Sequence, residues 1–140
     1  MVARFRQAVG WGSLLPVVLV TLLAVVGVGL WHYLGQPTPL PAAEVQSLLS
    51  GKTAGGRWPG GSAYLLYFAP EGAATYREPE KQAVEGSWRV ADSGALCLVF
   101  PARPEACYGV ARESGSLVWI QPGSGRTFAF NVKDGRDPAL

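Results

Sequence analysis

The chain has 140 residues, about the length of one ordinary domain, and only 16% of them are charged, against roughly 25% in typical soluble proteins. The shortage lies in one segment, because no Asp, Glu, Lys or Arg occurs from Gln7 to Ala43. The net charge of +2 comes from Arg4 and Arg6, since the other basic residues balance the 10 acidic ones. A neutral domain without clusters of Lys or Arg argues against nucleic acid as a partner.

Residues 14–34, LLPVVLVTLLAVVGVGLWHYL, predict a transmembrane helix. At about 1.5 Å per residue the segment spans about 31 Å, the thickness of the hydrocarbon core of a bilayer. Aromatic side chains with a polar edge favour the membrane interfaces. Such side chains stand at both ends of the segment: Trp11 before it, and Trp31, His32 and Tyr33 at its far end. We therefore expect the lipid bilayer to surround this helix.

The flanking charges predict the orientation of the helix. Arg4 and Arg6 precede it, and the next basic residue is Lys52, so the positive-inside rule places residues 1–13 in the cytoplasm. The rest of the chain would then lie in the periplasm, outside a bacterial inner membrane. A cleaved signal peptide is the alternative, with an apolar run of about 7–15 residues and a cleavage site of small residues. The run here is longer and ends in bulky side chains, which favours a single-pass anchor.

One face of the predicted helix carries Thr21, Ala24 and Gly27. Small side chains let a second helix approach closely, so we expect this face to pack against a larger membrane protein complex. The alternative is the ordinary abundance of Ala and Gly in membrane helices. His32, the one histidine, is a possible ligand of a metal or of a chlorophyll magnesium. Because no acidic residue or Cys lies near it, an interfacial role is favoured and no cofactor is expected.

Residues 35–41 contain three prolines and predict an extended, semi-rigid linker. After it, Val45, Leu48 and Leu49 recur at helical spacing, and Gly51 stands where a helix often ends. The sequence therefore predicts a short helix over residues 42–50, packed on one side of a domain formed by residues 42–140.

From Thr53 onward, short segments of alternating apolar and polar residues are separated by Gly, Pro, Asp and Ser. The turns at 69–72, 91–94, 112–115 and 122–125 each end in Gly, which readily takes a positive φ. Regular strands with short connections predict a mainly β domain whose consecutive strands pair antiparallel. About eight strands are expected, at residues 55–58, 63–68, 74–78, 86–91, 95–100, 106–112, 117–121 and 127–132.

Such a meander has to cover its edges and its apolar face, and closing into a small up-and-down β-barrel does both. A barrel of about eight strands has an interior just wide enough for side chains or for one small ligand. The side chains expected inside are Trp88, Val90, Leu96, Leu98, Phe100, Phe128, Phe130 and Val132. The polar segment from Asp134 to Leu140 is expected to be a free tail.

Cys97 and Cys107 are expected to form a structural disulfide, since the predicted topology places both on the oxidising side of the membrane. If the two cysteines face each other across a hairpin, Leu98 faces Ala106 and the bridge lies on the outer face of the barrel. A redox pair or a metal site are the alternatives. The spacing matches neither Cys-x-x-Cys nor a zinc motif, which favours the structural bridge.

No catalytic residue is expected. The β domain has no histidine, which excludes a Ser-His-Asp or Cys-His arrangement within it. Glu78, Glu80 and Glu85 are close enough in sequence for an acid–base pair, but a solvated connection between strands is the favoured interpretation. The remaining candidates for recognition are aromatic: Trp58, Trp88, Trp119, Tyr64 and Tyr67.

Two resemblances add to these inferences. Gly56-Arg57-Trp58, after a short helix, resembles the Gly-x-Trp opening of the lipocalins and calycins, and Gly86-Ser87-Trp88 repeats the pattern. The segments LLSG at 48–51, YFAPEG at 67–72, GSWRV at 86–90, LC at 96–97 and CY at 107–108 look like a group of small exported bacterial domains without known function. That likeness implies an envelope β domain with one disulfide and no established activity.

These observations support two hypotheses. The first is a non-enzymatic accessory subunit, whose helix joins a larger membrane complex, for example a respiratory or photosynthetic one, and whose β domain covers the periplasmic face. The second is a lipocalin-like module, tethered to the membrane, that binds a small apolar ligand or blocks an enzyme. A barrel filled with side chains would favour the first. A cavity of several hundred Å³, open at one end, would favour the second.

Overall fold

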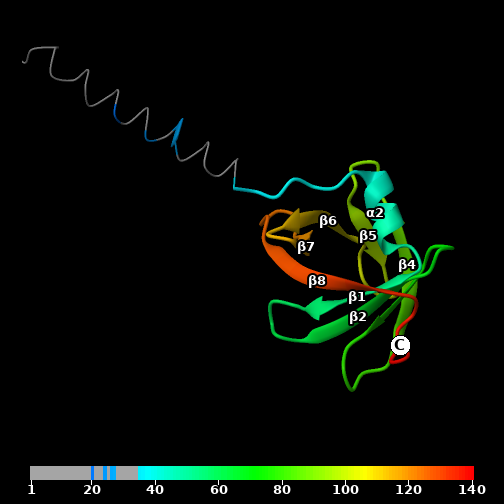
Figure 1. Ribbon diagram of the computed structural model, residues 1–140. Helices are drawn as coiled ribbons and strands as arrows, with labels where there is room; N and C mark the ends of the chain where they lie inside the picture. Colours follow the sequence, from blue (N-terminus) through cyan, green and yellow to red (C-terminus); the bar gives the residue numbers. More distant parts are fainter. Residues whose placement is uncertain (1–19, 21–23, 25, 28–34) are drawn as a thin grey trace, which may run out of the picture. The chain divides into compact units, whose positions relative to one another are not determined.

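The computed structural model describes residues 20, 24, 26, 27 and 35–140, and residues 37–140 form one compact unit (Figure 1). In this unit each strand pairs antiparallel with the next, and the last pairs with the first, so the sheet closes into a barrel. The predicted mainly β, up-and-down barrel with one short helix is confirmed. The elements are α2 (Ala42–Leu49), β1 (Lys52–Arg57), β2 (Ala63–Phe68), β3 (Ala73–Arg77), β4 (Val84–Val90), β5 (Leu96–Val99), β6 (Ala106–Glu113), β7 (Ser116–Ile120) and β8 (Thr127–Asp134).

The predicted transmembrane segment, residues 14–34, lies for the most part outside the described residues. Ala24 and Gly27 are described; both are helical and exposed. Within the described part of the chain, no helix has the length and apolar character needed to cross a membrane. The anchor and its packing face stay predictions. The other residues assigned to them, which fall outside the described part, are Trp11, Thr21, Trp31, His32 and Tyr33.

Alternation along the strands builds the core of the barrel. In β2, Tyr64, Leu66 and Phe68 are buried, whereas the residues between them are half-buried and face outward. Eight residues were predicted to lie inside from the same alternation, and all of them belong to the core or pack against it. Trp88, Leu96, Leu98 and Phe130 are buried, and the partly buried ones are Val90, Phe100, Phe128 and Val132.

The strand β1 begins three residues earlier than predicted, at Lys52 rather than Gly55. Its first residues show no apolar alternation, because buried Thr53 is polar and Ala54 is small. Hydrogen bonding to β2 on one side and to β8 on the other makes these residues a strand. The start of β1 is therefore set by pairing with distant segments, and the local sequence pattern does not predict it.

The helix α2 closes one end of the barrel. Val45 and Leu49 are completely buried in the core, and the helix contacts β1 and β4. The segment before the helix is fixed as well, since Leu40 N–H donates to the carbonyl oxygen of Val110 at 2.7 Å. The β1–β2, β3–β4, β5–β6 and β7–β8 turns lie at the opposite end, which no helix of residues 37–140 covers.

The expectation of a free C-terminal tail is wrong. The Thr53 hydroxyl donates to the carbonyl oxygen of Gly135 at 2.7 Å and accepts from the N–H of Asp137 at 3.0 Å. The Arg77 guanidinium donates to the carbonyl oxygen of Ala139. A buried hydroxyl needs such partners, and the tail supplies them. The polar composition of the tail gave no sign of this, because the partners are outward-facing residues of distant strands.

Candidate functional site

A cavity of about 410 Å³ lies at the end of the barrel opposite α2. Its volume falls within the range of about 300–1,000 Å³ typical of small-ligand sites. The wall is mostly apolar and comes from inward-facing residues at the ends of strands: Trp58, Leu66, Tyr76, Val84, Leu98, Phe100, Ala106 and Tyr108. The polar rim comes from turns: Glu78, Lys81, Gln82 and Arg103. The barrel is thus filled by side chains at its closed end and hollow at its open end.

Aromatic rings hold one another in place along the wall. Trp58 stacks on Tyr64, with the ring centroids 4.4 Å apart and the planes inclined by 20°. Tyr76 follows, 6.2 Å from Tyr64 and 5.9 Å from Phe100. Tyr108 lies 6.2 Å from Trp58 on the other side. Each such pair contributes about 0.5–1.5 kcal/mol beyond the burial of area, so the wall is ordered before any ligand arrives.

Phe100 reaches its position because its neighbour is a glycine. A Cβ on Gly86 would lie 2.3 Å from the carbonyl oxygen of Val99 and 2.5 Å from the Phe100 ring. Both distances are shorter than side-chain atoms allow, so only glycine lets β4 and the Phe100 ring approach this closely. Gly86 of the Gly-x-Trp repeat therefore shapes the wall of the cavity.

A chain of hydrogen bonds runs from the wall to the rim. Trp58 Nε1–H donates to the Tyr76 hydroxyl at 2.8 Å, and this hydroxyl donates to Glu78 Oε1 at 2.9 Å. The Lys81 ammonium pairs with the other oxygen of the Glu78 carboxylate. Among the described residues, no buried side-chain nitrogen or oxygen lacks a hydrogen-bond partner. The indole and phenol of the wall are thus already satisfied.

The protonation states of this chain follow from its surroundings. Burial raises the pKa of Tyr76 to about 12; the hydrogen bond from Trp58 opposes this shift, and the one to Glu78 adds to it. Hydrogen bonds from Lys81 and then from Tyr76 lower the pKa of Glu78. At neutral pH the phenol is therefore protonated and the carboxylate ionised.

The rim has one more cation than it has carboxylates, and the charge of Arg103 contributes, after the hydrogen bonds, to the lowered pKa of Glu78. Glu78 and Lys81 neutralise each other, whereas the guanidinium of Arg103 forms neither a hydrogen bond nor an ion pair within the part of the chain that the structure describes. The charged side chains that line the cavity are one carboxylate and two cations. The mouth therefore carries an excess positive charge.

The five aromatic candidates lie in three different environments. Trp88, Trp119 and Tyr64 are buried in the core, at 6%, 2% and 3% exposure, and Trp119 Nε1–H donates to the Tyr64 hydroxyl at 2.6 Å. Tyr67 lies on the outer face of β2. Trp58 is the one candidate of the five that lines the cavity. Tyr76, Tyr108 and Arg103 were not among the predicted candidates. The signal for the two tyrosines is their position on the inward face of strands near this end of the barrel, and Arg103 lies in a turn at the same end.

The glutamates do not form an acid–base pair, because their hydrogen bonds lead to different partners. Glu80 is exposed, as expected of a solvated connection. Glu85 accepts a hydrogen bond from the Thr75 hydroxyl at 3.0 Å. Glu78 departs from the expectation, since Tyr76 and Lys81 fix its carboxylate at the rim of the cavity.

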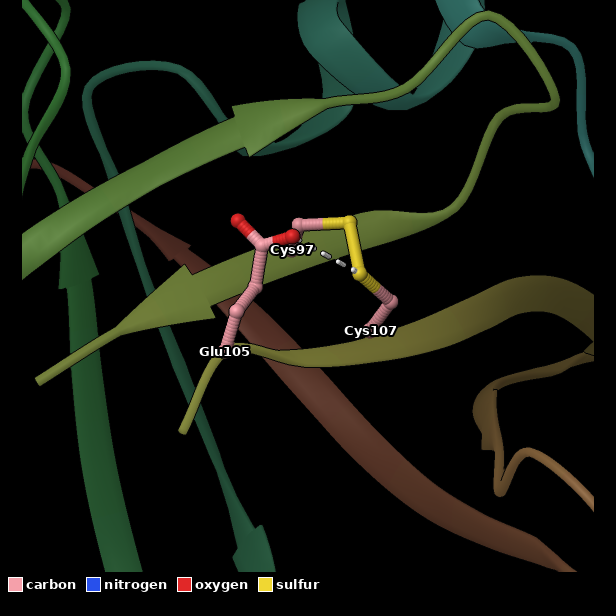
Figure 2. A group of neighbouring side chains, drawn as sticks. All are labelled: Cys97, Glu105 and Cys107. Carbon is pink, nitrogen blue, oxygen red and sulfur yellow. Dashed lines mark hydrogen bonds between the residues drawn. A yellow bond between two sulfur atoms is a disulfide. The ribbon is translucent and has the colours of Figure 1, made fainter. Parts of the chain in front are cut away.

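The predicted disulfide joins Cys97 and Cys107 across the β5–β6 hairpin (Figure 2), and the predicted register is confirmed, with Leu98 opposite Ala106. Figure 2 also shows Glu105 beside the bridge, with Oε1 3.9 Å from the Cys107 sulfur. A disulfide sulfur carries no proton to donate and is not a thiolate, so these side chains form neither a strong hydrogen bond nor a metal-ligand set. Arg89, which lies opposite Cys97 on β4, pairs with Glu105 at 2.8 Å, and Cys97 is only 2% exposed.

The family described as "Protein of unknown function (DUF995)" matches residues 18–115. The match includes α2 and the strands β1 to β6, with the disulfide and every residue of the cavity wall. It agrees with the resemblance to small β domains of unknown function. No curated protein matches the chain.

Proposed function

We propose that the chain, which belongs to the DUF995 family of unknown function, is a binding module whose barrel holds a small apolar ligand in its open end. The observation that carries this proposal is the cavity of about 410 Å³. A barrel of eight strands can be packed with side chains throughout, so a hollow end is a feature that packing does not require. The lipocalin-like hypothesis from the sequence is thus favoured over the accessory-subunit hypothesis, which depends on residues 14–34 and stays a prediction.

The wall of the cavity suits an apolar ligand. The Trp58 indole N–H bonds to the Tyr76 hydroxyl, so a ligand in the interior meets mainly ring faces and the aliphatic side chains of Leu66 and Leu98. Removing apolar surface from water contributes about 0.8 kcal/mol per buried CH₂ group. Because the rings are already held by stacking and hydrogen bonds, binding orders few side chains, and little of this free energy is lost.

The N-terminal anchor belongs to the same proposal. Residues 14–34 would hold the module on the inner membrane, with residues 1–13 in the cytoplasm and the barrel in the periplasm. Arg4 and Arg6 precede this segment, whereas the residues that directly follow it are uncharged. This difference in charge supports the orientation. The disulfide supports it as well, since such bridges persist in oxidising compartments.

Filling the cavity tests the proposed function. Residues 37–140 contain the complete barrel and its core, so this segment is expected to fold by itself. The probe is N-phenyl-1-naphthylamine, a neutral fluorophore that brightens in apolar sites. Ala106 lines the cavity, and in the Ala106→Trp variant an indole occupies the space of the ligand. Ala129 is exposed on β8 and does not line the cavity, so Ala129→Trp is the matched control.

We expect the unchanged segment and the A129W variant to bind the probe with equal affinity, and the A106W variant to bind it at least about tenfold more weakly. Unfolding in urea shows whether each variant is folded. The proposed function is wrong if the unchanged segment binds no probe, or if A106W binds it as tightly as A129W does.

A further inference from the structure

The charges at the mouth of the cavity indicate what kind of ligand enters it; this inference rests on the proposed function. A neutral ligand would need no charged group at the rim. A cationic ligand would need a free carboxylate, but Glu78 is already paired with Lys81 and accepts a hydrogen bond from Tyr76. The remaining charged side chain of the lining is Arg103. The lining therefore carries one excess positive charge, and Arg103 is the cation of the lining whose guanidinium is not hydrogen-bonded among the described residues.

The backbone of Arg103 is held firmly at the mouth. The residue lies in the β5–β6 turn, with Pro101 before it and Pro104 after it, and each proline fixes its own φ. Arg103 N–H donates to the carbonyl oxygen of Phe100 at 3.3 Å, which closes the turn. The disulfide closes the same hairpin a few residues away. A turn restricted in this way keeps the base of the Arg103 side chain beside the aromatic wall.

We propose that the natural ligand is an amphipathic monoanion, whose apolar body lies in the cavity and whose anionic group binds the Arg103 guanidinium at the mouth. The planar guanidinium donates two parallel hydrogen bonds to a carboxylate or to a similar oxyanion. In the interior the Trp58 indole N–H and the Tyr76 hydroxyl are already bonded, whereas the cationic donor Arg103 lies at the rim, so the anionic group is expected at the rim. The ionised carboxylate of Glu78 disfavours a second anionic group on the ligand.

Two probes with the same body separate this inference from the proposed function. N-phenyl-1-naphthylamine is neutral, and 1-anilinonaphthalene-8-sulfonate carries a sulfonate on the same ring system. The sulfonate stands in for the anionic group of the ligand. Both are titrated by fluorescence into residues 37–140, into the Arg103→Gln variant and into the matched control Arg126→Gln. Arg126 is exposed in the β7–β8 turn at the same end of the barrel and does not line the cavity.

We expect the sulfonate probe to bind the unchanged segment and the R126Q variant about tenfold more tightly than the R103Q variant, as a charge-assisted hydrogen bond predicts. The neutral probe should bind all three with the same affinity. Added salt should weaken the binding of the sulfonate probe and leave the binding of the neutral probe unchanged. The Arg103→Lys variant, which keeps the charge without the planar fork, should lie between wild type and R103Q.

The inference is overturned if R103Q weakens the sulfonate probe no more than R126Q does, while the neutral probe still binds. In that case the cavity binds apolar molecules and the proposed function stands. If neither probe binds the unchanged segment, the proposed function itself fails, and the anionic class of ligand fails with it.

Discussion

Two carboxylates help to fix segments at the surface of the barrel. Glu78 joins Tyr76 of β3 to Lys81 in the β3–β4 turn, and Asp137 joins Lys133 of β8 to the C-terminal tail. The bond from Lys81 is the main cause of the lowered pKa of Glu78. For Asp137, Lys133 and then the N–H of Ala139 lower the pKa. Both carboxylates therefore favour the folded state in their ionised form.

These two shifts predict a loss of stability in acid. A carboxylate whose pKa is lower in the folded state stabilises the fold above its unfolded pKa, here 4.5 for Glu78 and 3.8 for Asp137, and loses this effect as the pH falls through the folded value. The free energy of unfolding of residues 37–140, measured in urea by tryptophan fluorescence, should be constant near neutral pH and decline below about pH 5. The free energy of unfolding of the E78Q/D137N double variant should decline less steeply over the same pH range. Equal slopes for the two proteins would contradict this assignment.

At the scale of elements, the β5–β6 hairpin is the principal wall of the cavity. Half of the residues that line the cavity belong to this hairpin or to its turn: Leu98, Phe100, Pro101, Arg103, Pro104, Ala106 and Tyr108. The disulfide joins the two strands of the same hairpin on its outer face. The bridge therefore restricts the element that contributes most to the site.

Replacing both cysteines, in the Cys97→Ser/Cys107→Ser variant, should lower the free energy of unfolding by about 2–3 kcal/mol, as expected for the loss of a bridge that closes a short loop. The barrel should stay folded, because the apolar cluster that fills its interior is formed by other side chains. We also expect weaker binding of N-phenyl-1-naphthylamine, since the wall becomes less ordered. Urea unfolding and probe titration measure the two effects. Unchanged stability together with unchanged affinity would show that the bridge supports neither fold nor site.

The helix and the strands could be predicted well because the signals for each of them lie within a short segment of the sequence. Alternation located the strands, terminal glycines located the turns, and the spacing of Cys97 and Cys107 matched a hairpin with the observed register. The cavity could not be predicted in the same way. Whether the end of a barrel is filled depends on side-chain volumes added over eight strands, and on the close approach of Phe100 to Gly86. Trp58 was a candidate, but its partner Tyr76 lies on another strand.

At the scale of the whole molecule, the barrel unit has two unlike ends. The chain enters the unit beside α2, where Leu40 is bonded to Val110, and the cavity opens at the other end. Access to the cavity therefore does not require the segment around residue 40 to move.

The proposed topology predicts the result of a reporter fusion. Alkaline phosphatase, which is active only outside the cytoplasm, is joined after Leu140 through a flexible linker that leaves the bonded tail intact. The fusion should be active in a bacterial host and remain in the membrane fraction, because residues 14–34 stay attached. Moving the positive charges, by Arg4→Glu and Arg6→Glu with Gln36→Arg and Thr38→Arg, should reduce the activity. An inactive fusion of the unchanged chain, or a mature protein that begins near Ala43, would contradict the anchor.

The central claim is that the open end of the barrel binds a small apolar ligand beside Trp58, and the most direct test is the NMR signal of the indole N–H groups. Residues 37–140 contain three tryptophans, Trp58, Trp88 and Trp119. Adding N-phenyl-1-naphthylamine should shift the Trp58 signal until the site is saturated, because the probe lies against this ring. The signal of Trp88, whose indole is bonded to Ala69 in the core, should hardly move. A Trp58 signal that stays in place while the probe binds, or no binding at all, would contradict the account.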